Sequence, residues 1–146
     1  MNVVIMGCGR VGSYLATRLD REGHQVTVID VTTTAFSRLP DDFTGQTVVG
    51  TGIDEQVLRL AGIAEADAFV AVTEGDNRNI MAAQVAREIF GVRDVIARIY
   101  DPVREEVYRG LGIGTICPTK LISNLAYDRL LGDEMERRDD HAGTRR

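Results

Sequence analysis

Short apolar runs alternate along this chain with longer segments in which apolar residues recur every three or four positions. A continuous apolar run is typical of a strand buried on both faces of a parallel sheet, and the longer spacing is typical of an amphipathic helix. The pattern predicts strands over residues 2–6, 25–30, 46–49, 68–72, 95–99 and 115–116. It predicts helices over residues 10–22, 32–38, 55–61, 76–90, 102–109 and 119–131.

This alternation predicts an α/β fold, a Rossmann-like doubly wound sheet of six parallel strands with helices on both faces. Right-handed crossovers give the strand order 3-2-1-4-5-6, and a ligand then binds above the carboxyl ends of strands one and four. We expect residues 1–131 to form one domain, because the chain has 146 residues of which 44% are hydrophobic. Residues 132–146 are charge-dense and lack an apolar period, so we expect a flexible tail.

A glycine-rich turn follows the first predicted strand directly, with the sequence Gly7-Cys8-Gly9-Arg10-Val11-Gly12. In this motif the first glycine allows the tight turn, the second lets the backbone approach a pyrophosphate, and the third lets the helix pack on the sheet. The free N–H groups and the dipole at the helix start both favour an anion. The turn therefore predicts a phosphate-binding loop.

Asp30 ends the second predicted strand, eighteen positions after Gly12. This spacing is close to the ~20 residues that separate the glycine motif from the ribose-binding acid in dinucleotide-binding domains. An ionised carboxylate can accept two hydrogen bonds from a ribose diol, whereas it would repel a 2′-phosphate. The pattern predicts binding of NAD(H), ATP, ADP or AMP, and it disfavours NADP.

Composition limits the binding partners and the cellular compartment that we expect for this protein. The net charge is −5 and the chain has no basic stripe, so nucleic acid is not expected as a partner. No run approaches the ~20 apolar residues of a membrane span, and the start of the chain lacks the pattern of a signal peptide. Two distant cysteines suggest no disulfide framework, so we expect a cytoplasmic protein without direct membrane insertion. His24 and His141 lack neighbouring ligands, so no metal site is expected.

Residues 50–63, 66–79 and 95–102, read in order with the glycine motif, resemble the potassium-transport nucleotide-binding domain, also called the regulator of K⁺ conductance (RCK/KTN) domain. The likeness covers about residues 1–131. It implies a cytosolic regulatory subunit of a Trk/Ktr-type potassium uptake system. In that family the domain forms homodimers and often octameric rings, binds NAD(H) or ATP/ADP, and gates a membrane K⁺ channel at the inner face of the plasma membrane.

The resemblance also implies the site. It places Arg10 near terminal phosphates, Thr73 and Glu74 in a turn over the cofactor, and Arg98 within reach of the phosphates. The candidate cofactor-binding residues are Gly7, Cys8, Gly9, Arg10, Val11, Gly12, Asp30, Val31, Thr51, Gly52, Thr73, Glu74, Asn77, Asn79 and Arg98.

Three departures from the family pattern change these expectations. Thr51 stands where the family often has an acidic or amide residue beside the adenine, so adenine recognition is expected to be looser. Thr119 stands where some ATP-gated members carry a carboxylate that helps to hold a cation, which favours NAD(H) or ADP over Mg-ATP. Many members continue into a second small domain, so the chain is either a single-domain member or a piece that ends at the boundary.

Several residues allow two interpretations. Asp76, Asn77 and Asn79 start the long helix over 76–90, where they can cap the helix or contact a nicotinamide or phosphate. Cys8 lies at a helix start that would stabilise a thiolate, so it is either a redox switch or a small residue packed under the loop. Cys117 is expected in the core.

The last two helices carry further alternatives. Glu105 and Glu106 are expected to lie on a solvated face. The apolar stripe of the final helix can close the core of the sheet or form a dimer interface; its residues are Leu121, Ile122, Leu125, Ala126, Leu130 and Leu131.

No catalytic constellation is evident in the sequence, so we expect a ligand sensor and not an enzyme. The first alternative is the cofactor domain of an NAD-dependent oxidoreductase without its substrate domain. The second is a dimerisation module that keeps the fold and binds nothing.

Overall fold

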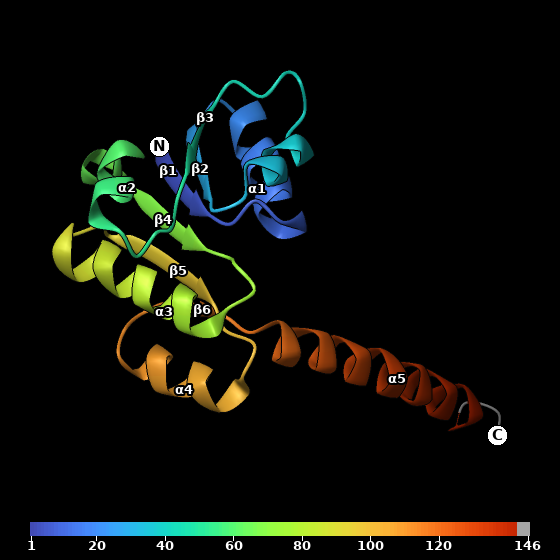
Figure 1. Cartoon of the computed structure of the whole chain (residues 1–146). Coiled ribbons are helices and arrows are strands. Elements are labelled where there is room, and N and C mark those ends of the chain that lie inside the picture. The colour runs from blue at the N-terminus through green and yellow to red at the C-terminus, as the bar shows by residue number, and fades with distance from the viewer. Residues whose placement is uncertain (143–146) are drawn as a thin grey trace.

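The structure, a computed structural model, describes the backbone of residues 1–142 and the side chains of residues 1–132, so the His141 side chain lies outside it. Six parallel strands form one sheet in the order β3-β2-β1-β4-β5-β6, which confirms the predicted fold class and topology (Figure 1). The strands are β1 (Asn2–Met6), β2 (Gln25–Asp30), β3 (Gln46–Val49), β4 (Ala68–Ala71), β5 (Asp94–Arg98) and β6 (Gly114–Ile116).

The helices follow the predicted order with differences in type and length. They are α1 (Arg10–Arg21), the 3-10 helix η1 (Thr33–Arg38), α2 (Glu55–Leu60), the 3-10 helix η2 (Ile63–Glu65), α3 (Asp76–Gln84), the π-helical turn η3 (Val85–Ile89), α4 (Pro102–Gly110) and α5 (Pro118–Ala142). The segment 76–90 is thus an α-helix that ends in a π turn. The helix expected to stop at 131 continues to Ala142, so the charged segment begins as helix, and its flexibility stays a prediction.

Side chains alternate between two cores, one on each face of the sheet, because successive strand residues point to opposite sides. On one face α1 and η1 cover Val3, Ile5, Val26, Val28 and Val70. On the other face α2 and α3 cover Val4, Met6, Ile29, Phe69 and Ala71. The two layers cover the two faces of the sheet, and the loops that follow the strands leave it at the edge formed by their carboxyl ends.

The strand register brings the glycine loop to the switch point of the sheet. Met6, the last residue of β1, lies beside Ile29 of β2 and Ala71 of β4. The chain that leaves β1 therefore enters the gap between the ends of β2 and β4. A parallel doubly wound sheet binds its ligands at this point.

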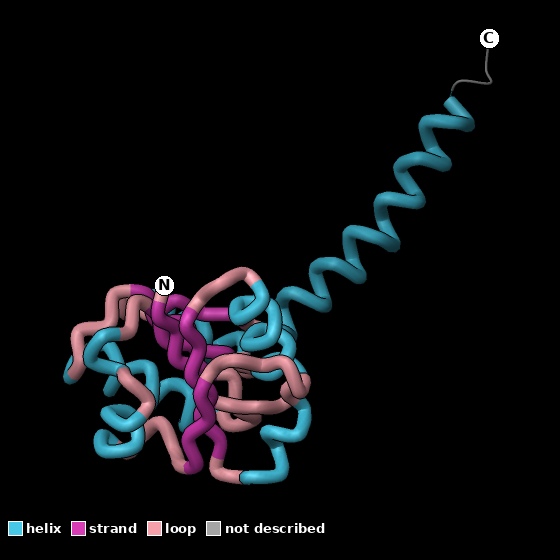
Figure 2. The backbone as a smooth tube through the Cα atoms, turned by 90° about the horizontal axis from the view of Figure 1, so that it is seen from above, coloured by secondary structure: helices cyan, strands magenta, loops and turns pink. Residues whose placement is uncertain are grey.

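Helix α5 leaves the body of the domain and does not fold back on the sheet (Figures 1 and 2). Over residues 121–132, where the structure describes the side chains, its apolar residues are exposed, with Ile122 68%, Leu125 65% and Leu130 71% accessible. The interpretation in which this stripe closes the core of the sheet is therefore wrong. A contiguous apolar surface of this kind is typical of an interaction site.

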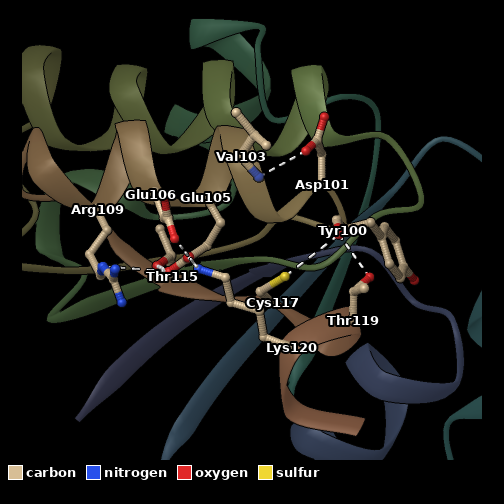
Figure 3. A network of polar contacts seen from close by, with 10 residues as sticks. All are labelled: Tyr100, Asp101, Val103, Glu105, Glu106, Arg109, Thr115, Cys117, Thr119 and Lys120. Atoms are coloured by element: carbon tan, nitrogen blue, oxygen red, sulfur yellow. Dashed lines mark hydrogen bonds and ion pairs between the residues drawn. The ribbon is translucent and has the colours of Figure 1, made fainter. Parts of the chain in front are cut away.

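A network of polar contacts joins α4, β6 and the start of α5 (Figure 3). The Glu105 carboxylate is only 4% exposed and accepts hydrogen bonds from Lys120 Nζ at 2.7 Å and Thr115 Oγ1 at 2.6 Å. Arg109 lies 3.8 Å from the same carboxylate, and the exposed Glu106 lies 3.2 Å from Lys120. The expected solvated face is thus wrong for Glu105, because the start of α5 covers it.

The pKa of the Glu105 carboxyl is lowered from its ordinary value of 4.5, first by the hydrogen bond from Lys120 and then by the one from Thr115. A lowered pKa in the folded state adds stability above the ordinary pKa, and this contribution is lost as pH falls through the lowered value. We expect Glu105→Gln to be less stable than the wild type at pH 7, with a difference that shrinks at low pH, as the pH falls below the ordinary value of 4.5 and through the lowered pKa. Urea unfolding at both pH values measures it.

Glu106→Gln is the matched control, because Glu106 is an exposed carboxylate on the same helix that contacts the same lysine. Its effect should be small at both pH values, as is usual for exposed ion pairs. A loss of stability in Glu105→Gln that is the same at pH 7 and at low pH would show that the charge of Glu105 contributes nothing.

Candidate functional site

A cavity of about 800 Å³ opens at the carboxyl ends of the strands, at the switch point described above. Its volume is in the range of small-molecule sites, and its position is that of ligand sites in doubly wound sheets. Most of the candidates chosen from the sequence line it: Gly7, Cys8, Gly9, Arg10, Val11, Asp30, Val31, Thr51, Thr73, Glu74 and Arg98.

The three glycines of the loop have different physical roles. Gly7 has a φ of +111°, and a Cβ there would lie 3.0 Å from the Val72 carbonyl group. A Cβ on Gly12 would lie 1.8 Å from the Gly7 carbonyl oxygen, and Gly12 does not line the cavity. A Cβ on Gly9 would meet nothing within 4 Å. Gly7 and Gly12 are therefore required by the fold, whereas the space beside Gly9 belongs to the cavity.

The Asp30 carboxylate ties the glycine loop to the end of β2. One oxygen accepts a hydrogen bond from the Cys8 N–H and the other accepts one from the Thr32 N–H, both at 2.8 Å. A carboxylate offers about four acceptor positions, so two remain for hydroxyl donors. Asp30 thus combines the predicted acceptor position with a structural task that the sequence did not reveal.

The charge of the lining is positive although the chain is acidic. Arg10, Arg38, Arg78 and Arg98 line the cavity with two carboxylates, Asp30 and Glu74. In addition, α1 begins at the cavity. The first N–H groups of any helix have no acceptor within the helix and can donate to a ligand. Together these donors suit an anionic ligand such as a phosphate.

Arg98 crosses from β5 to the wall formed by the end of β4. Its Nη2 donates to the carbonyl oxygens of Val72 at 2.8 Å and Thr73 at 2.9 Å, and its guanidinium stacks on the Tyr100 ring with 5.0 Å between Cζ and the ring centroid. Its Nε is buried and has no partner within the described residues. Arg98 is therefore firmly held at the wall and still has an unused donor.

Sequence reasoning missed Arg38, Arg78, Thr34 and Tyr100, all of which line the cavity. Tyr100 lies two residues beyond Arg98 at the carboxyl end of β5, a position that the topology rule could have identified. Arg38 reaches the cavity only because η1 turns the chain back, which places its Nη1 3.4 Å from the Cys8 carbonyl oxygen. No local pattern indicates that return.

Asn79 was a candidate for cofactor contact, and the structure instead buries it completely. Its amide oxygen accepts from the Thr73 N–H and hydroxyl, and its amide nitrogen donates to the carbonyl oxygens of Thr73 and Arg98, both at 2.9 Å. Asn79 does not line the cavity. Its hydrogen bonds position Thr73 and Arg98, which do line it.

Asn77 and Gly52 also lie outside the cavity lining. The Asn77 amide oxygen accepts from Arg104 Nη1 at 2.9 Å, and a Cβ on Gly52 would lie 2.4 Å from Met6 Sδ, so Gly52 is a packing residue. Asp76 does not cap α3, because Gly75 occupies that position. The Asp76 carboxylate accepts from the N–H groups of the loop after β5.

Both cysteines are buried, Cys8 fully and Cys117 with 6% exposure, which confirms Cys117 as a core residue. The pKa of the Cys8 thiol is raised from its ordinary value of 9.0, first by burial and then by the Asp30 carboxylate, and Arg38 opposes the shift. The surroundings do not stabilise a thiolate, which argues against the redox-switch interpretation.

We expect both thiols of the native protein to react slowly with an aromatic disulfide reagent at pH 7, and quickly after unfolding in guanidinium. The raised pKa of the Cys8 thiol keeps that group protonated at pH 7, and burial restricts the access of the reagent to both thiols. The absorbance of the released thiolate measures the reaction rate. The Cys8→Ser variant shows which part of that rate belongs to Cys8. A native Cys8 that reacts as fast as free cysteine would contradict the burial.

Within residues 1–142, no helix combines the length and the apolar character that crossing a bilayer requires. The described residues also contain no cluster of three or more histidine, cysteine or acidic side chains suited to a metal ion.

Comparison with known proteins places these features in a family. Residues 3–118 match the family model described as the TrkA-N domain. The chain belongs to the TrkA-N domain family. The match runs from β1 to the start of α5. It therefore includes every residue that lines the cavity.

Two curated relatives align with most of this chain. The chain is 56% identical over 131 residues to the Trk system potassium uptake protein TrkA of Streptomyces coelicolor, which covers 90% of this chain and 59% of the relative. It is 38% identical over 113 residues to a TrkA homolog of Methanothermobacter thermautotrophicus, which covers 77% and 52% respectively. The chain thus spans somewhat more than half the length of these relatives. Their names do not favour the oxidoreductase alternative.

Solved structures share the TrkA-N fold. The TrkA-N domain of the inner membrane protein ybaL from Escherichia coli superimposes with a TM-score of 0.78 at 20% identity, covering 88% of this chain and 96% of that chain. The GsuK RCK domain has a TM-score of 0.74 at 25% identity, covering 90% and 28%. These matches confirm the RCK resemblance.

The similar structures include nucleotide-bound forms. A Kef C-terminal domain from Shewanella denitrificans, in an AMP-bound form, has a TM-score of 0.72 at 18% identity and covers 97% of this chain and 95% of that chain. A GsuK channel bound to NAD has a TM-score of 0.67 at 22% identity and covers 80% and 21%.

Proposed function

We propose that this domain is the nucleotide sensor of a regulatory subunit in a Trk/Ktr-type potassium uptake system. The observation that carries the proposal is the positive cavity at the switch point, which joins the glycine loop, the Asp30 carboxylate and four arginines. In this function NAD(H) or ATP, ADP or AMP binds in the cavity, and the domain acts on a membrane K⁺ channel or transporter from the cytoplasmic face. The domain does not catalyse a reaction.

The residues present fit such a nucleotide. The open space beside Gly9 admits a pyrophosphate close to the backbone, where the helix start of α1 supplies N–H donors. The two remaining acceptor positions of Asp30 suit ribose hydroxyls, and its negative charge disfavours the 2′-phosphate of NADP. Arg10 and Arg98 supply cations for the phosphates, and Thr51 lies on the wall expected for the adenine. The nucleotide-bound structural neighbours support the same class of ligand.

The sensor works through a difference in affinity. A nucleotide changes the balance between two arrangements of the assembly only by as much as it binds one arrangement more tightly than the other. We propose that the assembly is a homodimer, which in the family can build octameric rings, and that the exposed stripe of α5 supplies the contact between copies. The exposure of Leu125 and Leu130 supports this assignment.

Nucleotide binding is tested by a thermal-shift titration with NAD⁺, NADH, ATP, ADP, AMP and NADP⁺, with and without Mg²⁺. A ligand that binds only the native state at a hundred times its Kd should raise the midpoint by roughly 5–10 °C in a domain of this size. Gly9→Ala should remove most of this shift and leave the ligand-free midpoint nearly unchanged, because its Cβ meets only the cavity.

Gly110→Ala is the matched control, because a Cβ there also meets nothing within 4 Å and Gly110 lies outside the cavity. It should keep the full shift. Asp30→Ala should lose the shift together with part of the stability, since it also releases the Cys8 N–H. If no nucleotide moves the wild-type midpoint, the sensor function is wrong and the dimerisation module becomes the better assignment.

Assembly through α5 is tested by sedimentation equilibrium of Leu125→Asp. A charge in the centre of the apolar stripe should weaken association at least about tenfold, because burying an unpaired carboxylate is costly. Ser123→Asp introduces the same charge at a polar position of α5, where no apolar side chain is removed, and should weaken association much less than Leu125→Asp does. A wild type that remains monomeric at high concentration would refute the dimer.

A further inference from the structure

The arginines that line the cavity have no carboxylate partner in the protein. Arg10, Arg38, Arg78 and Arg98 form no ion pair among the described residues, although Asp30 and Glu74 line the same cavity. Most other arginines of the domain do form one, namely Arg18, Arg21, Arg87, Arg93, Arg104 and Arg109. The positive charge of the cavity is therefore left for a ligand to neutralise, which favours a strongly anionic one.

The cavity has two ends, which lie on opposite sides of the glycine loop. Asp30 ends β2 and Arg38 ends η1, so both belong to the β2 side. Arg98 ends β5, and Arg78 lies in the first turn of α3, which follows β4, so both belong to the β4 side. Because β1 lies between β2 and β4 in the sheet, the loop after β1 separates the two ends.

This arrangement decides which part of a nucleotide reaches the β4 side. A nucleotide whose ribose binds Asp30 and whose first phosphates lie beside Gly9 directs the rest of its chain towards Arg78 and Arg98. That part is a terminal phosphate in ADP or ATP and a nicotinamide riboside in NAD⁺ or NADH. A phosphate offers the charge and the acceptor oxygens that suit a guanidinium group. The positively charged nicotinamide ring of NAD⁺ would instead face two like charges.

The two arginines of the β4 side differ in how they are held. Arg98 Nη2 donates to the carbonyl oxygens of Val72 and Thr73, so this guanidinium is part of the wall. The Arg78 side chain is exposed and takes no part in the hydrogen bonds that hold this wall within the described residues. A Cβ on Gly75 would lie 3.4 Å from Arg78 Nε, so Arg78 lies against the turn after β4. Its guanidinium is thus available to a ligand, and the fold does not depend on it.

We infer that Arg78 is a specificity-determining residue, which selects nucleotides that continue into a terminal phosphate, ADP or ATP, over NAD⁺ and NADH. This inference rests on the proposed nucleotide site and names the class of its ligand. Glu74 is the carboxylate that lines this end of the cavity, and Arg78 and Arg98 outnumber it. Without Arg78 the two remaining charges, Glu74 and Arg98, balance, and the preference for a terminal phosphate is lost.

The test compares five ligands by calorimetric titration of the whole chain at pH 7, without divalent cations that would neutralise the phosphates. The ligands are ADP, ATP, AMP, NAD⁺ and NADH. We expect the wild type to bind ADP and ATP at least about tenfold more tightly than NAD⁺, NADH or AMP, because a charge-assisted hydrogen bond to the terminal phosphate is worth about that factor.

Arg78→Gln should weaken ADP and ATP at least about tenfold and weaken AMP, NAD⁺ and NADH less than about threefold, since those three present no terminal phosphate to this residue. Arg78→Lys keeps the charge and should retain part of the preference. Arg104→Gln is the matched control. It removes the same charge from α4, where Arg104 contacts Asn77 and Asp101 outside the cavity lining, and it should leave the ratio of the ADP and NAD⁺ affinities nearly unchanged.

The failure of the selectivity can be told apart from the failure of the proposed function. A wild type that binds NAD⁺ or NADH at least as tightly as ADP overturns the selectivity and leaves the nucleotide sensor standing. An unchanged ADP affinity in Arg78→Gln, or an equal loss for all five ligands, overturns the assignment to this residue. Absence of binding by every nucleotide overturns the proposed function, and the selectivity with it. A thermal midpoint of ligand-free Arg78→Gln close to that of the wild type excludes unfolding as the cause of weaker binding.

Discussion

The site depends on one interaction, the pair of hydrogen bonds that the Asp30 carboxylate accepts from Cys8 and Thr32. The glycine loop contains few side chains that could hold it, and Gly7 adopts a backbone conformation that few other residues reach. The carboxylate at the end of β2 therefore supplies the restraint that fixes the loop over the sheet. Burial raises the pKa of the Cys8 thiol, and the Asp30 charge raises it further and gives this end of the cavity its acceptor character.

The opposite wall uses a different device. There Asn79 and Asp76, both at the start of α3, accept or donate bonds that fasten the ends of β4 and β5. The two walls face each other across the cavity. Hydrogen bonds to Asp30 hold one wall, and hydrogen bonds to the start of α3 hold the other. Since parallel strands direct their carboxyl ends to a single edge, small polar residues at helix starts are well placed to connect them.

The direction of α5 follows from polar contacts at its base. In a doubly wound sheet the helices pack on the faces of the sheet, but here contacts with Glu105 and Tyr100 hold the first turn of α5 beside the sheet. The apolar stripe then remains available to a partner. The burial of Glu105 is consequently part of the same arrangement that exposes Leu125.

Much of this molecule was readable from the sequence. The alternation of apolar runs and helical periods determined the six-stranded order, and the glycine motif with Asp30 located the cavity, because these signals depend on residues close together along the chain. Only the tertiary structure decided that Asn79 braces the wall, that Arg38 and Arg78 reach the cavity, that Glu105 is buried and that α5 projects from the body. These outcomes depend on contacts between segments distant in sequence, where the identity of the partner, and not the local pattern, determines whether a polar side chain binds a ligand or holds the fold.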